Sequence, residues 1–207
     1  MTFFATSSDR PRQDSGHGVK TVDYTSNVLQ LFIEGLDAHP TAQVLDLGPV
    51  CQENIRFFAR ARRVKRLYVC DMFIRLERCL GKGDPVDRIW HELDYPPESF
   101  DGILIWELAD RLDDGEVRSL VKLCYTLLKP GGMAVVLVLG EQAARLGVNS
   151  FVIGQDFKVR LRSQYHLHLP IRSRQNRDIL AMMTPLKPAK SFICRPGFME
   201  FLFIRDR

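Results

Sequence analysis

Short apolar segments alternate with helical segments through the middle of this chain, and this alternation limits the folds open to it. Apolar runs end at Asp46, Asp71 and Trp106, and the residues between them carry apolar side chains at helical spacing. Strands separated by helices pair in parallel, because a crossover that holds a helix returns the chain to the same end of the sheet. The run from Met133 to Leu139 is apolar at every position, which is typical of a strand buried on both faces. The sequence therefore predicts a parallel sheet with helices on both sides.

Apolar spacing and chain-breaking residues set the expected elements. Amphipathic helices are expected at 23–37, 55–59, 73–80, 117–128 and 177–183. Strands are expected at 43–48, 66–70, 86–90, 100–106, 133–139, 191–194 and 198–204. Only Arg195-Pro196-Gly197 separates the last two strands, and so short a connection joins antiparallel neighbours. A parallel sheet that ends in an antiparallel hairpin excludes the simple doubly wound dehydrogenase pattern.

The 207 residues are expected to form one domain preceded by an arm. Residues 1–22 are mostly polar and offer little to bury, so a flexible arm is expected there, followed by a single domain over 23–207. The first residues lack the basic flank and apolar core of a signal peptide, and no apolar run reaches the roughly 18 residues of a membrane span. Five cysteines without a CxxC spacing fit a reduced, cytoplasmic protein.

The positive charge of the chain is concentrated near its end. Residues 155–207 hold 11 Lys and Arg against 4 Asp and Glu, whereas the whole chain has a net charge of +4. Such a segment suits an anionic partner, and it equally suits a solvated surface. No motif for reading a nucleic-acid groove accompanies it, and the arginines near the helix at 55–59 have no exposed aromatic side chains between them to stack on bases. Nucleic acid is therefore not the expected partner.

Three stretches resemble the class I S-adenosylmethionine-dependent methyltransferases. VLDLGPVCQENIRFFAR (44–60) is similar to the family's first strand, nucleotide loop and helix. Ser-Phe-Asp at 99–101 and Leu-Lys-Pro-Gly-Gly at 128–132 are similar to two further signatures, and SFICRPGFMEFLFIRD (191–206) to the closing hairpin. The resemblance spans residues 24–207. It implies a Rossmann-like three-layer α/β/α sandwich with a seven-stranded sheet, six strands parallel and one antiparallel.

The same resemblance implies a cofactor, S-adenosylmethionine, and a function, methyl transfer to a small-molecule acceptor. In open parallel sheets the ligand binds beyond the carboxyl ends of the strands. There the resemblance implies that Asp71 accepts hydrogen bonds from the ribose hydroxyls and that His91 lies at the adenine edge. It also implies that Asp46 and Gly48 form the nucleotide loop, and that Trp106 lines the methionine arm or the substrate.

Each of these residues has an ordinary structural explanation as well. Asp71 could cap the helix that follows it, and Asp46 could hold loop amides without any ligand. His91 could be a surface residue at the end of a strand. Glu107 and Asp110 are candidates for a general base, although acidic residues in the first turn of a helix also stabilise its dipole. The sequence therefore names no catalytic residue.

The nucleotide loop departs from the family's pattern. Of the usual three glycines only Gly48 remains, Pro49 removes a backbone donor, and Val50 brings a side chain to the place where the backbone approaches the cofactor. This departure favours an alternative, a methyltransferase-like protein that has lost catalysis and serves as a binding or regulatory module. No metal site is expected either, since His166 and His168 share a strand face without a third ligand.

Residues 141–176 are too long for a plain connection, which usually takes about 2–6 residues. Their first part, 141–154, is compatible with a short helix, and their second part, 157–171, alternates as an extended segment does. We expect this stretch to be a lid over the substrate or an accessory hairpin. In the second case the hairpin would provide the surface of a homodimer.

Overall fold

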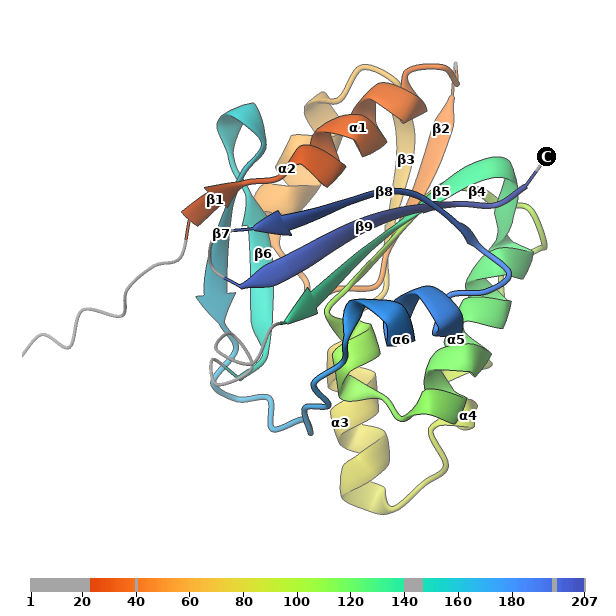
Figure 1. The fold of residues 1–207 in the computed structure, drawn as a ribbon, viewed down its shortest axis with the longest axis vertical. Helices are drawn as coiled ribbons and strands as arrows, with labels where there is room; N and C mark the ends of the chain where they lie inside the picture. The colour runs from red at the N-terminus through yellow and green to blue at the C-terminus, as the bar shows by residue number, and fades with distance from the viewer. Residues whose placement is uncertain (1–22, 40, 140–146, 195–196, 207) are drawn as a thin grey trace, which may run out of the picture.

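The computed structural model describes residues 23–39, 41–139, 147–194 and 197–206 (Figure 1). Its main sheet has six strands in the order β3-β2-β4-β5-β9-β8. These strands are β2 (Ala42–Asp46), β3 (Val64–Val69), β4 (Phe100–Trp106), β5 (Leu128–Leu139), β8 (Lys187–Cys194) and β9 (Phe198–Ile204). Strands β3, β2, β4 and β5 run parallel, and β9 is antiparallel to both of its neighbours, β5 and β8. The structure thus confirms the expected parallel sheet closed by an antiparallel hairpin.

The expected strand at 86–90 is wrong. The segment forms one helical turn, α4 (Asp87–Trp90), so the described residues form a main sheet of six strands rather than seven. Val86, Ile89 and Trp90 are buried while the two residues between them are exposed. These three positions have the i, i+3, i+4 spacing of a helix, which a window of five residues does not separate from a strand.

The two faces of the main sheet are covered by different elements. One face packs against α3 (Met72–Lys82), α4, α5 (Asp114–Leu127) and α6 (Asn176–Met182). The other face packs against α1 (Asn27–Leu36), α2 (Gln52–Arg60) and a second, smaller sheet. Side chains of β4 alternate between the two cores, since Ile103 and Ile105 belong to the first and Leu104 and Trp106 to the second. The central strands are therefore buried on both faces.

The smaller sheet was not predicted from the sequence. Its three antiparallel strands have the order β1-β7-β6, with β1 (Asp23–Thr25), β6 (Asn149–Ile153) and β7 (Lys158–Ser163). The expected helix at 23–37 begins later, because Ser26 accepts a hydrogen bond from the Leu29 amide at 3.0 Å and caps α1. The expected arm at 1–22 and residues 141–146 of the expected helix at 141–154 lie outside the described residues. In its described part that helix is wrong, because Asn149–Ile153 forms β6 and pairs with β7.

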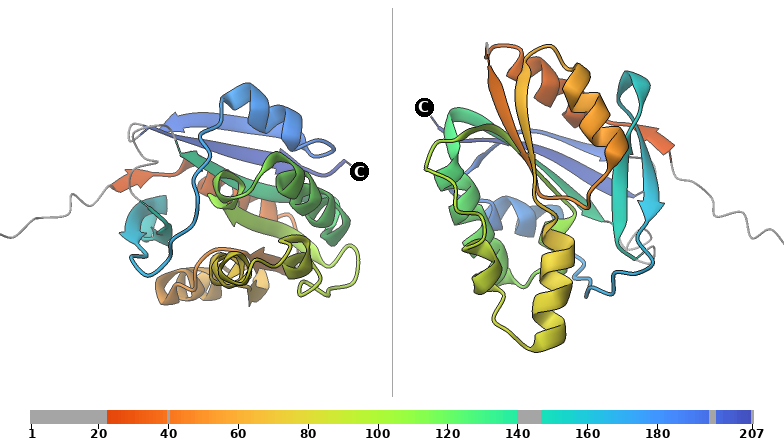
Figure 2. Two further views of the ribbon diagram at one scale, coloured as in Figure 1. Left: turned by 90° about the horizontal axis from the view of Figure 1, so that it is seen from below. Right: turned by 180° about the vertical axis from the view of Figure 1, so that it is seen from behind.

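One asparagine joins the smaller sheet to α2. The Asn54 side chain donates to the Phe151 carbonyl at 2.9 Å and accepts from the Ile153 amide at 2.8 Å. The Asn54 side chain therefore pairs with backbone hydrogen-bonding groups at the edge of β6, as a neighbouring strand would. Figures 1 and 2 both show β6 next to α2. This attachment fixes Phe151 close to the carboxyl end of β4.

Candidate functional site

The carboxyl ends of β2, β3 and β4 meet at one edge of the main sheet. Strand β2 lies between β3 and β4, so the chain reverses its direction of travel across the sheet at β2. Ligands of open parallel sheets bind at such a switch point. Asp46 ends β2, Asp71 follows β3, and Trp106 ends β4. Gly48 lies two residues after Asp46. The structure thus brings four of the five expected cofactor residues to this edge, all except His91.

Asp46 is buried and organises the loop after β2. Its Oδ1 accepts hydrogen bonds from the Gly48 amide at 2.9 Å and from the Trp106 indole nitrogen at 2.6 Å. Burial raises the pKa of Asp46 to about 6, although both hydrogen bonds oppose the shift. The carboxylate therefore links the loop after β2 to the end of β4.

Trp106 adopts a conformation that is rare for a large side chain. Its φ is +55°, in the left-handed region. The indole stacks on the Phe151 ring with 5.5 Å between centroids and 4° between planes. A Cβ placed on Gly48 would lie 2.5 Å from the Trp106 Cδ1 atom, so the indole covers the open face of this glycine. Strain of this kind gathers at functional sites, where the surrounding structure holds it in place.

Asp71 binds two backbone amides. Its Oδ1 accepts from Ile74 at 3.0 Å and caps α3, and its Oδ2 accepts from Val50 at 3.2 Å. The structural alternative for Asp71, capping the helix that follows it, is therefore present. Asp71 is only half-buried, however, and each carboxylate oxygen has a second lone pair for a further donor. Two hydroxyl groups of a ribose would be such donors.

His91 follows a helix, whereas Asp46, Asp71 and Trp106 lie at the ends of strands. It is exposed and follows α4, so the strand that was expected to carry it to the sheet edge does not exist. Its expected contact with adenine stays a prediction. Val50 is 62% exposed, so its side chain contributes little to the packing of the loop.

A buried charged cluster follows β4, and its pairing was not predicted. Glu107 Oε1 accepts from the Arg111 guanidinium at 2.8 Å and from the Asn149 amide at 3.0 Å. Asp110 Oδ2 accepts from the Leu139 amide at 2.7 Å. Burial raises the pKa of both carboxyl groups to about 7, against the attraction of Arg111 in the case of Glu107. Both acids tie β4 to neighbouring strands, which is a structural role.

The described residues contain neither a candidate metal site nor a candidate membrane span. Among its residues, no group of three or more His, Cys, Asp or Glu side chains is placed to hold a metal ion. No helix in the described ranges is both long and apolar enough to cross a membrane.

Solved structures with a similar fold include S-adenosylmethionine-dependent methyltransferases. The N-methyltransferase NodS from Bradyrhizobium japonicum has a TM-score of 0.53 at 16% identity, covering 86% of this chain and 94% of that chain. A Methanosarcina mazei enzyme has a TM-score of 0.52 at 11% identity, covering 87% and 98%. The 1,6-didemethyltoxoflavin N1-methyltransferase of Burkholderia thailandensis, solved with that compound and S-adenosylhomocysteine, has a TM-score of 0.51 at 16% identity, covering 87% and 79%.

The likeness establishes the fold, which is that of the class I S-adenosylmethionine-dependent methyltransferases, as the sequence resemblance implied. No family model matches this chain, and no curated protein matches it by sequence.

The residue types at the sheet edge are compatible with binding of S-adenosylmethionine. Asp71 offers acceptors for ribose hydroxyls, and Gly48 lacks the side chain that would keep a ligand from the loop backbone. The indole of Trp106 occupies the open face of Gly48 in this conformation. A ligand that approached this face of Gly48 would have to displace the Trp106 side chain.

Proposed function

We propose that this chain binds S-adenosylmethionine at the carboxyl edge of β2, β3 and β4 and transfers its methyl group to a small-molecule acceptor. One observation carries the proposal. A sheet with the methyltransferase strand pattern places Asp46, Gly48 and Asp71 together at its switch point. A fold alone does not define an activity, so the proposal rests on these residues.

Each residue has a distinct part in holding the cofactor. Asp71 accepts the ribose hydroxyls while it keeps its bonds to α3 and to the loop. Asp46 holds the loop amide of Gly48 and does not itself need to touch the ligand. His91 is proposed at the adenine edge. Trp106 rotates away from Gly48 to lie beside the methionine arm. Breaking its present hydrogen bond and its aromatic stack costs more than this new contact gains.

The proposed reaction needs little chemistry from the protein. When bound, S-adenosylmethionine supplies an activated methyl group on a sulfonium. The protein contributes by holding the acceptor in line and near this group, an effect of position. Glu107 and Asp110 are wholly buried and bonded to backbone amides, so neither is proposed as the general base. An acceptor that is already deprotonated needs none.

Residues 164–175 are proposed to wall the acceptor site. They follow β7 and are fixed at three points. The His168 amide donates to Glu77 of α3 at 2.7 Å, and the Arg172 amide donates to the Asp110 carbonyl at 2.8 Å. The buried Arg174 side chain donates to the carbonyls of two residues after β4. These anchors favour a fixed cover over a freely opening lid.

The substitution Asp71→Asn tests the ribose contact. Asparagine is as good an N-cap as aspartate, so thermal stability should change little. Affinity for S-adenosylhomocysteine should fall about tenfold to a hundredfold, because a hydrogen bond to a charged group contributes about 1.5–3 kcal/mol. Calorimetric titration measures it. The matched control is Asp113→Asn at the N-cap of α5, which should leave the affinity unchanged. Equal affinity of the two variants for S-adenosylhomocysteine would show that Asp71 does not contact the cofactor.

A non-catalytic binding module is the second candidate function. The observation that favours it is the Trp106 indole on Gly48, held by the hydrogen bond to Asp46 and the stack on Phe151. This candidate predicts that the unmodified chain binds no S-adenosylmethionine. It also predicts that freeing the face of Gly48 does not create binding.

A further inference from the structure

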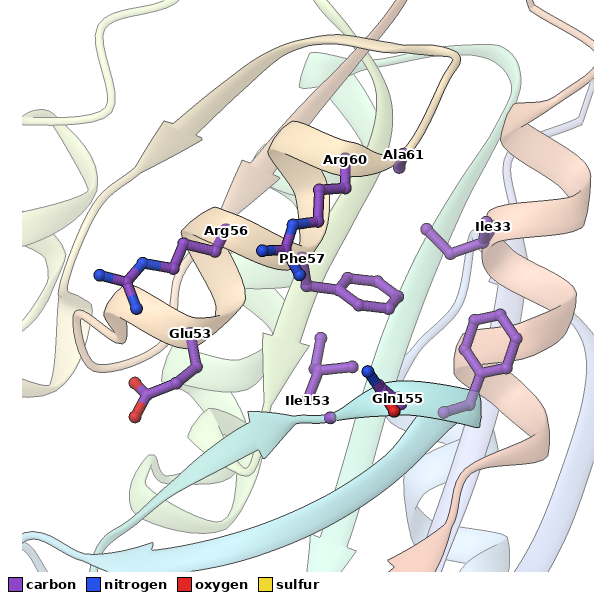
Figure 3. Close-up of a pocket in the computed structure, with 10 residues that line it drawn as sticks. Ile33, Glu53, Arg56, Phe57, Arg60, Ala61, Ile153 and Gln155 are labelled. Carbon is purple, nitrogen blue, oxygen red and sulfur yellow. The ribbon is translucent and has the colours of Figure 1, made fainter.

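A cavity lies away from the sheet edge, between α1, α2 and the loop that joins β6 to β7 (Figure 3). Its volume is about 500 Å³. Pockets that bind small molecules have volumes of roughly 300–1,000 Å³. The cavity shares no lining residue with the edge of β2, β3 and β4, so it is a separate candidate site.

The interior of this cavity is apolar. Ile33 of α1, Phe57 of α2, Ile153 of β6 and Phe157 line it. The rings of Phe57 and Phe157 meet edge to face, with 6.0 Å between centroids and 74° between planes. Phe57 and Ile33 are only half-buried, and Figure 3 shows both side chains directed into the same space. An apolar ligand would cover surface that the protein itself leaves uncovered.

The loop at the cavity has an unusual backbone. Asp156 and Phe157 have φ values of +52° and +55°, which is the left-handed region for two consecutive residues with side chains. Hydrogen bonds hold the loop in this form, from the Gly154 amide to the Lys158 carbonyl at 2.7 Å and from the Ser26 amide to the Phe157 carbonyl at 2.9 Å. This strained conformation places Phe157 at the cavity. Strain kept at a pocket wall points to function.

The mouth of the cavity is positively charged. Arg56 and Arg60 lie one turn apart on the exposed face of α2, and within the described residues neither forms an ion pair. The nearby acid, Glu53, is paired with Arg162, which lowers the pKa of Glu53 to about 2. Figure 3 shows Arg60 reaching back toward Phe57, and Gln155 on the opposite wall. Arg60 offers an anion a guanidinium group at the mouth, whereas Figure 3 shows the Arg56 guanidinium directed away from the cavity, so Arg56 adds positive charge on the same face of α2 without facing the mouth directly.

We propose that this cavity binds a small amphipathic carboxylate, with its apolar body between Phe57 and Phe157 and its carboxylate at Arg60, on a face of α2 to which Arg56 adds positive charge. The apolar interior and the cationic mouth together select such a ligand over a neutral or cationic one. The site is independent of methyl transfer, since it shares no residue with the proposed cofactor edge.

Octanoate and octan-1-ol are the probes, because they share the apolar chain and differ at the head group. In ¹³C-labelled protein, octanoate should shift the methyl resonances of Ile33 and Ile153 and leave those of Ile103 and Ile179 in the other core unchanged. Octanoate should bind at least about tenfold more tightly than octan-1-ol, because only octanoate forms a hydrogen bond between two charged groups. Equal affinities, or no shift at Ile33 and Ile153 at millimolar octanoate, would overturn the proposal.

Two variants locate the binding. The double substitution Arg56→Gln and Arg60→Gln lies on the exposed face of α2 and should abolish the preference for octanoate. The matched control, Lys65→Gln with Arg66→Gln at two exposed positions of β3, removes the same charge and should keep the preference. Ala61→Leu at the cavity wall should block both probes by filling the space. Unchanged octanoate binding in the first and third variants would contradict the site.

Discussion

Replacing Arg111 by methionine is expected to lower the free energy of unfolding by about 3–5 kcal/mol, the cost of leaving one partner of a buried ion pair alone. Arg111 is 2% exposed, and its guanidinium donates to Glu107 and to the Gly147 carbonyl. Methionine fills much of the volume but leaves Glu107 buried without its cation. Chemical denaturation measures the change. The control Arg118→Met, at an exposed position of α5, should cost no more than about 0.5 kcal/mol.

The loss in Arg111→Met should depend on pH. Burial raises the pKa of Glu107 to about 7 in the folded chain, above its usual value of 4.5. A carboxyl group with a raised folded pKa stabilises below its unfolded pKa, and this contribution is lost as pH rises through the folded value. Without Arg111 the folded pKa rises further, so the variant should lose more stability at pH 8 than at pH 5.

Adding Glu107→Gln to Arg111→Met provides the check on this cause. The double variant should recover part of the free energy of unfolding. Its remaining loss should be the same at pH 5 and pH 8, because residue 107 can no longer ionise. A single variant as stable as Arg118→Met, or a loss that is equal at both pH values, would show that the ion pair does not hold the end of β4.

Trp106→Ala is expected to have two opposite effects. Removing a buried tryptophan should cost about 3–5 kcal/mol of stability, because it leaves a cavity between β4 and β6. Affinity for S-adenosylhomocysteine should nevertheless rise at least about tenfold. In the unmodified chain, binding competes with the hydrogen bond to Asp46 and the stack on Phe151, and this competition lowers the apparent affinity. Titration calorimetry below the melting temperature measures the change.

A milder pair of variants separates opening of the site from general loosening. Phe151→Leu removes the ring on which Trp106 stacks and should raise the affinity by a smaller factor. Phe201→Leu makes the same change at a buried position in the other core and should leave the affinity unchanged. If Trp106→Ala folds and binds no better than the unmodified chain, the indole does not obstruct the site.

The strands that form the main sheet could be predicted because their apolar runs are long or closed by clear turns. The all-apolar run in β5 and the short turn before β9 are examples. Four residues of α4 carry too little periodicity to separate a helical turn from a strand. The smaller sheet joins β1 to β7, residues more than 130 positions apart in the chain, and no local pattern encodes such a pairing.

Asp46, Asp71 and Trp106 were all expected at the ends of strands from the sequence, whereas Phe151 and the conformation of Trp106 were not. Asp46 and Asp71 stand where strands end, which the chain shows directly. The position of Trp106 depends on a left-handed backbone and on Phe151, which comes from a separate sheet. The pairing of Glu107 with Arg111 has the i, i+4 spacing that a helix would provide, but its burial follows from elements that pack later in the chain.

Calorimetric titration of the full chain with S-adenosylmethionine and S-adenosylhomocysteine tests the central claim most directly. The proposed methyltransferase should bind both compounds, with dissociation constants between about 1 μM and 1 mM, the usual range for enzymes and their substrates. Trp106→Ala should bind them more tightly than the unmodified chain. The absence of binding at millimolar concentration in both proteins, while both remain folded, would contradict the account.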